Sequence, residues 1–272
     1  MSTPPLVAVA HGSRDARSAA TVRALARAVR DQAPDLEVRT AFLDLSEPTL
    51  AEVLGELHSA GHRDVVVVPL LLGSAFHARV DLPELIADIG TSMPLLRVTV
   101  SGVLGPDPAL ESAALDRLRQ AGAEPGDPEV GVALTGVGSS REAANEAVAT
   151  IARRWHGSTG FAAVTHAFAT ARPGPATALA RLRARGARKQ AIAPWFLAPG
   201  LLLDRIALEA PDCRIAEPLG DHPLVAELVL RRYHAVSGST AHRVGHRVTP
   251  SRAASAQPAL TPALPTAASL AG

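Results

Sequence analysis

The sequence predicts an α/β protein of two similar lobes, each a mainly parallel sheet flanked by helices, and three patterns support this. Short apolar segments alternate with segments of helical periodicity, as in chains built from strand–helix–strand units. The run 65–72 is continuously apolar, as expected of a strand that helices bury on both faces. The same succession of segments then begins again in the second half of the chain.

The first half contains four expected strands and three expected helices. The strands are 6–10, 37–43, 65–72 and 96–103, and the helices are 18–32, 49–60 and 82–89. In the helix 18–32, apolar residues recur at i, i+3, i+4 and i+7, from Val22 to Val29. The second helix is expected to end at Gly61.

The second half repeats this order, with strands expected at 130–135, 161–166 and 190–197 and helices at 141–155 and 176–185. An offset of 126 residues sets Gly12 over Gly138 and Phe42 over Phe168, and an offset of 125 sets Pro69 over Pro194. We therefore expect an N-terminal lobe at 1–123 and a degenerate repeat at 127–235, with the linker at 121–128. The remaining segment, 236–272, is rich in Ser, Thr, Ala and Pro and is expected to be disordered.

Composition excludes several classes of protein. The chain has 27 Lys+Arg against 26 Asp+Glu, which argues against a nucleic-acid partner. Cys213 is the only cysteine, so an internal disulfide and a Cys-ligated iron–sulfur cluster within one chain are excluded. No apolar run approaches the ~20 residues of a membrane span, and the N-terminus lacks the features of a signal peptide. We expect a cytoplasmic protein with no membrane partner; the sequence leaves the oligomeric state open.

Three polar residues follow the expected strands of the first half: His11, Asp44 and His77, spaced 33 residues apart. Ligands of parallel α/β sheets bind outside the carboxyl ends of the strands. Two imidazoles and a carboxylate suit a divalent metal such as iron, cobalt, nickel or zinc, and they equally suit proton abstraction. Each residue also has a structural alternative: His11 as a helix-entry residue beside Gly12-Ser13, with Ser13 as the N-cap, Asp44 as a turn residue, and His77 in a solvated loop.

The repeat lacks all three candidates. Val137 stands opposite His11 and Thr170 opposite Asp44 at the larger offset, and Leu202 faces His77 at the smaller one. The scaffold residues persist nevertheless: Gly138, Ser139, Phe168 and Pro194. This contrast favours one working site in the first lobe and none of its kind in the second.

These motifs together resemble the sirohydrochlorin chelatase family. The matching segments are 7–14 (VAVAHGSR), 41–50 (AFLDLSEPTL) and 66–83 (VVVPLLLGSAFHARVDLP). The resemblance covers about the first 105 residues closely and the second half more loosely, and the long, two-lobed form with one active half is known in this family. It implies a chelatase-like fold and a lyase that inserts a divalent metal into sirohydrochlorin, in siroheme or cobalamin biosynthesis.

By this resemblance His11 and His77 hold the metal, Asp44 completes the set, and one of these groups accepts a pyrrole proton. The family often has Glu where this chain has Asp44, and the nearby Glu47 is the alternative carboxylate. The metal, Fe²⁺ first and Co²⁺ or Ni²⁺ as alternatives, is a substrate, and no cofactor is expected.

The substrate's carboxylate-rich rim suggests further contacts in a cleft between the lobes. Arg14 and Arg79 could pair with carboxylates, and Ser13 and Ser74 could donate hydrogen bonds to the substrate. Solvated charge is the alternative for the arginines, and capping or turn roles are the alternative for the serines. The other open interpretation of the chain is a non-catalytic carrier of the tetrapyrrole or the metal. A hydrolase, ATPase or NAD enzyme is unsupported, because no nucleophile elbow, Walker A loop or dinucleotide fingerprint occurs.

Overall fold

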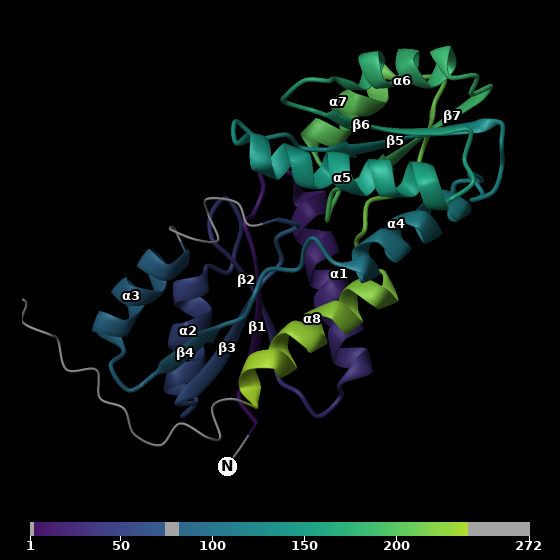
Figure 1. Cartoon of the computed structure of the whole chain (residues 1–272). Helices are drawn as coiled ribbons and strands as arrows, with labels where there is room; N and C mark the ends of the chain where they lie inside the picture. Colours follow the sequence, from purple (N-terminus) through teal and green to yellow (C-terminus); the bar gives the residue numbers. More distant parts are fainter. Residues whose placement is uncertain (1–2, 74–81, 239–272) are drawn as a thin grey trace, which may run out of the picture.

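The computed structural model of the chain describes residues 3–73 and 82–238 and shows two four-stranded parallel sheets flanked by helices (Figure 1). The first sheet has the order β2-β1-β3-β4, and the second has the corresponding order β6-β5-β7-β8. The strands are β1 (Leu6–Ala10), β2 (Val38–Phe42), β3 (Asp64–Pro69), β4 (Arg97–Val100), β5 (Val130–Gly136), β6 (Ala163–Phe168), β7 (Lys189–Pro194) and β8 (Arg214–Ile215). The predicted two-lobed α/β fold class is confirmed.

Helices connect the strands and cover both faces of each sheet. They are α1 (Ala16–Gln32), α2 (Leu50–Ser59), α3 (Leu82–Ser92), α4 (Pro108–Gln120), α5 (Glu142–Ser158), α6 (Pro175–Ala184), α7 (Leu201–Glu209) and α8 (Pro223–Ser237). The central strand β1 is buried along its whole length, and five of the six residues of β3 are buried. Continuous apolar character therefore marks strands that are covered on both sides, as predicted.

The alternative role of Ser13 as a helix N-cap is wrong. The N-cap is Asp15, whose carboxylate accepts a hydrogen bond from the Arg17 amide at 2.9 Å. The Ser13 hydroxyl instead accepts a bond from the Asp15 amide at 3.1 Å. Asp15 caps the helix because its carboxylate satisfies an amide that the first turn leaves open.

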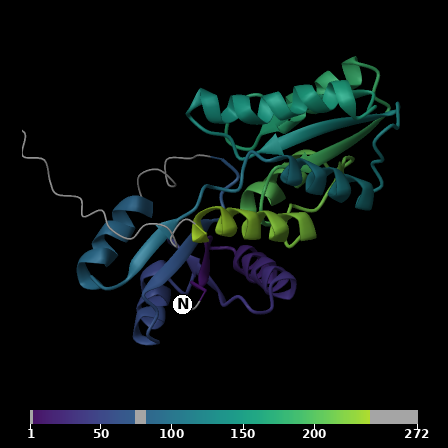
Figure 2. The same cartoon turned by 60° about the horizontal axis from the view of Figure 1, so that its bottom comes forward.

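The lobes exchange helices, which local periodicity did not reveal. Helix α4 follows the first sheet but packs on β7, and α8 ends the described chain but packs on α1 and β3 of the first lobe (Figures 1 and 2). The predicted boundaries at 1–123 and 127–235 follow chain order, so they place α4 in the first lobe and α8 in the second. They stay a prediction.

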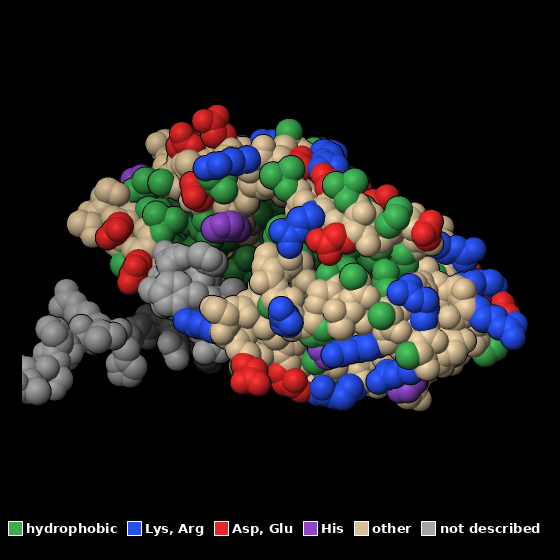
Figure 3. Space-filling model, turned by 90° about the horizontal axis from the view of Figure 1, so that it is seen from above, with side chains coloured by type: hydrophobic (Ala, Val, Ile, Leu, Met, Phe, Trp, Pro, Cys, Tyr) green, Lys and Arg blue, Asp and Glu red, His purple; other side chains and the backbone are tan. Residues whose placement is uncertain are grey.

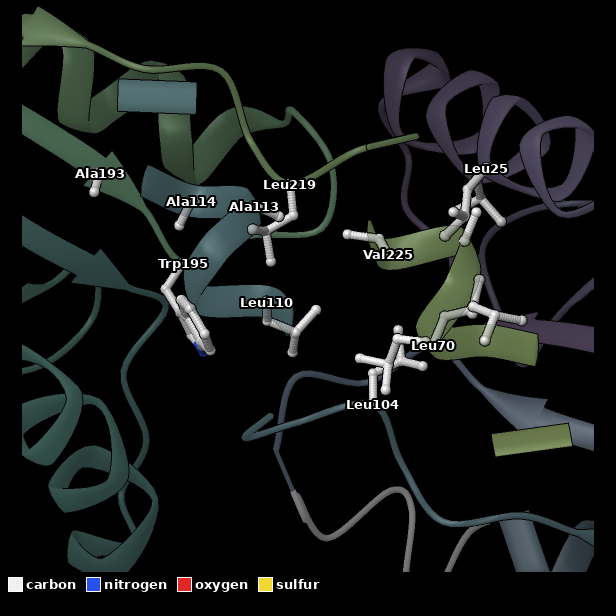
Figure 4. Close-up of a cluster of buried hydrophobic side chains, with 14 of the residues drawn as sticks. Leu25, Leu70, Leu104, Leu110, Ala113, Ala114, Ala193, Trp195, Leu219 and Val225 are labelled. Atoms are coloured by element: carbon white, nitrogen blue, oxygen red, sulfur yellow. The ribbon is translucent and has the colours of Figure 1, made fainter. Parts of the chain in front are cut away.

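One hydrophobic cluster runs through both lobes. Leu25 and Leu70 from the first lobe, Leu110 from α4 and Trp195 after β7 belong to it, and all four side chains are buried (Figure 4). Such a shared core fixes the lobes relative to one another, because neither can separate without exposing apolar surface.

Residues 236 and 237, which the sequence assigned to the tail, belong to α8. Helix α8 continues through Val236 to Ser237, because Val236 packs against the shared core. The rest of the predicted tail, 239–272, lies outside the described residues. Within the described ranges, no helix has the length and apolar character needed to cross a membrane.

Candidate functional site

Parallel pairing of β1 and β2 brings His11 and Asp44 to the same edge of the first sheet. Ala10 is opposite Phe42 at the ends of the two strands. The pairing continues beyond them, since the Leu43 amide donates to the Ala10 carbonyl and the Asp44 amide to the His11 carbonyl, each at 2.9 Å. Both His11 and Asp44 are exposed. The structure thus places two of the three predicted site residues on adjacent chain segments.

Gly12 makes this close approach possible. Its φ is +98°, in the region that favours glycine, and a Cβ built on it would lie 1.7 Å from the carbonyl oxygen of Asp44. No side chain fits at that distance. Glycine after the histidine is therefore a requirement of the site's backbone geometry.

The loop after Asp44 is held in an unusual conformation. Leu45 adopts a φ of +60°, and its side chain is 47% exposed. The Asp44 carboxylate accepts a hydrogen bond from the Leu45 amide at 2.7 Å. Ser46 exchanges two hydrogen bonds with the backbone of Ser13, at 3.1 and 3.0 Å. Strained residues of this kind persist where the surroundings fix them, and they cluster at functional sites.

Other predicted site residues are less directly placed. Glu47 is exposed, and its carbonyl, which belongs to the cis peptide bond with Pro48, accepts a hydrogen bond from Arg23 at 2.7 Å. Arg14 is also exposed. His77, Arg79 and Ser74 lie outside the described residues. Among the described residues, which do not include His77, no group of three His, Cys, Asp or Glu side chains could hold a metal.

The second lobe repeats the backbone of this region without counterparts of His11 and Asp44. The Thr170 amide donates to the Val137 carbonyl at 2.9 Å, the same contact that joins Asp44 to His11. The Thr170 hydroxyl donates to that carbonyl as well, at 2.8 Å. Val137 is 44% exposed. The predicted equivalences of Val137 with His11 and of Thr170 with Asp44 therefore correspond to equivalent positions in the two sheets, whereas that of Leu202 with His77 involves a residue outside the described ranges.

An ion pair joins the two lobes beside the site. The Arg17 guanidinium donates to the Asp204 carboxylate with an Nη1–Oδ1 distance of 3.2 Å. Arg17 lies in the first turn of α1, which follows the carboxyl end of β1, and Asp204 lies in the first turn of α7, which follows the carboxyl end of β7. The two carboxyl edges therefore lie near each other, as the predicted cleft requires. The molecular surface is hollowed in the view of Figure 3, where a histidine and hydrophobic side chains are exposed.

Arg17 and the carboxylates that it contacts stabilise one another's charged forms. The hydrogen bond that Arg17 donates to Asp15, followed by the one that it donates to Asp204, raises the pKa of the Arg17 guanidinium. The same contact with Arg17 lowers the pKa of Asp15. This pair could not be predicted from the sequence, because nothing in the local pattern at Arg17 or Asp204 shows that the two residues meet.

The remaining histidines with described contacts have structural roles. His62 pairs with Glu37, and His156 accepts a hydrogen bond from the Val164 amide. His222 caps α8, and His234 packs edge-on against Tyr233. His166 lies inside β6 rather than at the strand end, because the strand continues to Phe168. Burial, then the charges of Arg181 and Arg153, lowers the pKa of His166.

The molecule is a two-lobed α/β protein whose two parallel sheets have neighbouring carboxyl edges. His11 and Asp44 lie on adjacent segments at the first edge, where the second has Val137 and Thr170. A family model described as CbiX matches residues 5–121 and 131–236, so the chain belongs to the CbiX family. The resemblance inferred from the motifs is thereby confirmed.

The chain is also similar to sirohydrochlorin chelatases along most of its length. The sirohydrochlorin ferrochelatase of Bacillus subtilis is 26% identical over 85% of this chain and 91% of its own length. The sirohydrochlorin cobaltochelatase of Priestia megaterium is 26% identical over 73% of this chain and 65% of its own. The structure of SirB from Bacillus subtilis with Fe³⁺ superposes with a TM-score of 0.74 at 25% identity, covering 88% of this chain and 97% of that one.

Proposed function

We propose that this chain is a chelatase that inserts a divalent metal ion, with Fe²⁺ the first candidate, into sirohydrochlorin. The observation that carries the proposal is the pair formed by His11 and Asp44, exposed together at the carboxyl edge that faces the second lobe. Family membership and the names of the relatives supply the substrate class.

Each residue has a defined task in this proposal. Metalation of the macrocycle exchanges two pyrrole protons for one M²⁺ ion. The neutral imidazoles of His11 and His77 would take up the incoming metal as it loses water, and Asp44 would complete the set. One of these three groups would then accept a pyrrole proton, and such base catalysis contributes about 10²–10⁴-fold.

Asp44 is the preferred carboxylate over Glu47. Its amide is bonded directly to the His11 carbonyl, whereas Glu47 lies three residues farther along the loop. The shorter aspartate side chain is compensated by this closeness of the two backbones. Arg14, Arg79, Ser13 and Ser74 remain proposed contacts to the substrate's polar rim. The Ser13 hydroxyl accepts from the Asp15 amide, and its proton remains available for donation.

The choice of metal separates the nearest alternatives. Imidazole and carboxylate ligands accept iron, cobalt and nickel, and relatives named for iron and for cobalt both match this chain. A carrier that only binds its cargo would have the same ligands. Multiple turnovers per polypeptide distinguish an enzyme from a carrier.

The test is anaerobic turnover of sirohydrochlorin with Fe²⁺, Co²⁺ and Ni²⁺ in parallel, followed by the absorbance change of the macrocycle. His11→Ala and His77→Ala are expected to lower kcat/KM by at least about 100-fold. His234→Ala, an exposed histidine on α8, is the matched control and should leave the rate unchanged. Wild-type rates in both His11→Ala and His77→Ala would overturn the assignment.

A further inference from the structure

The second lobe contains a basic groove that the metal site does not use. A cavity of about 740 Å³ lies between α6, α7 and the loop that precedes α6. Three arginines, Arg172, Arg181 and Arg205, line it together with a single acid, Glu209. The groove therefore carries an excess of positive charge in a chain whose overall charge is nearly balanced.

Two of the three guanidinium groups are available to a ligand. Arg205 pairs with Glu209 at an Nε–Oε1 distance of 3.4 Å, and it donates to the Ala169 carbonyl. Within residues 3–73 and 82–238, the guanidinium groups of Arg172 and Arg181 form no hydrogen bond and no ion pair. Planar guanidinium groups that lack a partner match carboxylate and phosphate oxygens.

The equivalent place in the first lobe shows what the groove has lost. Helices α2 and α6 have the same length and both follow a cis-proline loop at an offset of 125 residues. In the first lobe, Glu52 reaches back over the start of α2 and accepts a hydrogen bond from the Thr49 amide at 2.8 Å. This bond lowers the pKa of Glu52. A carboxylate of the protein itself thus occupies the start of α2.

At the start of α6 that carboxylate is missing. Thr177 replaces Glu52, and the N-cap Gly174 supplies no side-chain hydrogen bond. The neighbouring positions reverse their charge, because Arg172 stands in place of Glu47 and Arg181 in place of Glu56. The start of α6 thus lacks the protein's own carboxylate and has two arginines where the first lobe has acids. These differences favour binding of a carboxylate from a ligand at the start of α6.

We propose that this groove is a second binding site, separate from His11 and Asp44, for a carboxylate-bearing anion. The ligand's carboxylate would take the place that Glu52 occupies in the first lobe, with Arg172 and Arg181 as its partners. Two sources supply this chemistry: a free small polycarboxylate, or a rim carboxylate of the macrocycle in the proposed reaction. The groove also opens at Thr170, the counterpart of Asp44, so it borders the carboxyl edge of the second sheet.

The test is calorimetric titration of the full chain with citrate at low salt, which requires no turnover. We expect saturable binding that Arg172→Gln and Arg181→Gln each weaken about tenfold or more. The control Arg183→Gln removes an equal charge from the same helix without lining the cavity, and it should bind citrate as the wild type does. No saturable binding to the wild type, or equal loss in the control, would overturn the proposal.

A variant that adds an interaction guards against misfolding as an explanation. Thr177→Glu copies Glu52 and should fill the site internally, abolishing citrate binding while the thermal midpoint stays equal or rises. Unchanged citrate binding in this variant would contradict the proposal. The source is identified by steady-state kinetics: a raised KM for sirohydrochlorin in Arg181→Gln supports the macrocycle rim, and an unchanged KM supports a free anion. Because binding and turnover are read separately, failure of one proposal leaves the other standing.

Discussion

Replacing Gly12 with alanine should damage both the fold and the site, and Gly61 provides a matched control. The two glycines have almost the same backbone conformation, with φ values of +98° and +97°. A methyl group on Gly61 meets nothing within 4 Å, whereas one on Gly12 would lie 1.7 Å from the Asp44 carbonyl oxygen. The pair therefore separates the cost of the left-handed backbone from the cost of the collision.

The magnitudes follow from these two contributions. Left-handed backbone at a residue with a Cβ costs about 1–2 kcal/mol, which is the expected loss of stability for Gly61→Ala. Gly12→Ala should cost about 2–5 kcal/mol, because the loop must also move and weaken the hydrogen bonds that tie residues 43 and 44 to β1. The displaced Asp44 should lower chelatase activity strongly in Gly12→Ala and leave it intact in Gly61→Ala.

Urea unfolding followed by circular dichroism measures the free energy of unfolding, and initial rates of metal insertion measure the site. The m value should stay constant, since the change alters native contacts rather than the surface exposed on unfolding. Equal loss of stability in the two variants, with full activity in Gly12→Ala, would refute the claim that Gly12 sets the distance between His11 and Asp44.

Two further outcomes concern the joint between the lobes. Leu110→Ala should lower the free energy of unfolding by about 2–5 kcal/mol, because its fully buried side chain belongs to the core that both lobes share. Tryptophan fluorescence and circular dichroism should give coincident unfolding transitions, and separate transitions would contradict this prediction. Burial opposes ionisation of Asp107, but hydrogen bonds from the Ala109 amide and Arg231 outweigh it and lower its pKa. A lowered pKa stabilises the fold at neutral pH and ceases to do so as pH falls below about 4. The stability gap between wild type and Asp107→Asn in urea should therefore narrow in acid, and a gap independent of pH would contradict the reasoning.

Sequence patterns located the sheets well because burial on both faces leaves a continuous apolar signal. The strand expected at 6–10 coincides with β1, and the helix expected at 176–185 is within one residue of α6 at each end. The strand expected at 161–166 was displaced by two residues, which put His166 at a strand end that belongs to Phe168. Boundary errors of this size arise because propensity does not encode where pairing with a neighbour stops.

Long-range packing accounts for what sequence patterns missed. Helix α4 has buried residues at Leu110, Ala113, Ala114 and Leu118, a helical spacing that was present in the sequence but not assigned. No local pattern, however, shows that α4 covers β7 or that α8 returns to the first lobe. The pairing of Arg17 with Asp204 was hidden for the same reason, since it depends on how the lobes face each other.

The duplication explains why site residues could be inferred at all from one chain. Both lobes keep the glycine with positive φ, the backbone bond across the strand ends and the cis-proline before the next helix. With that scaffold held constant, differences between the lobes report side-chain chemistry instead of folding requirements. The second lobe has Val137 and Thr170 in place of His11 and Asp44, and this difference supports the proposal that metal insertion takes place at the first lobe. Arginine at positions 172 and 181, where the first lobe has acids, supports the proposed anion site in the second lobe, and on the two proposals together one lobe binds the metal and the other a carboxylate.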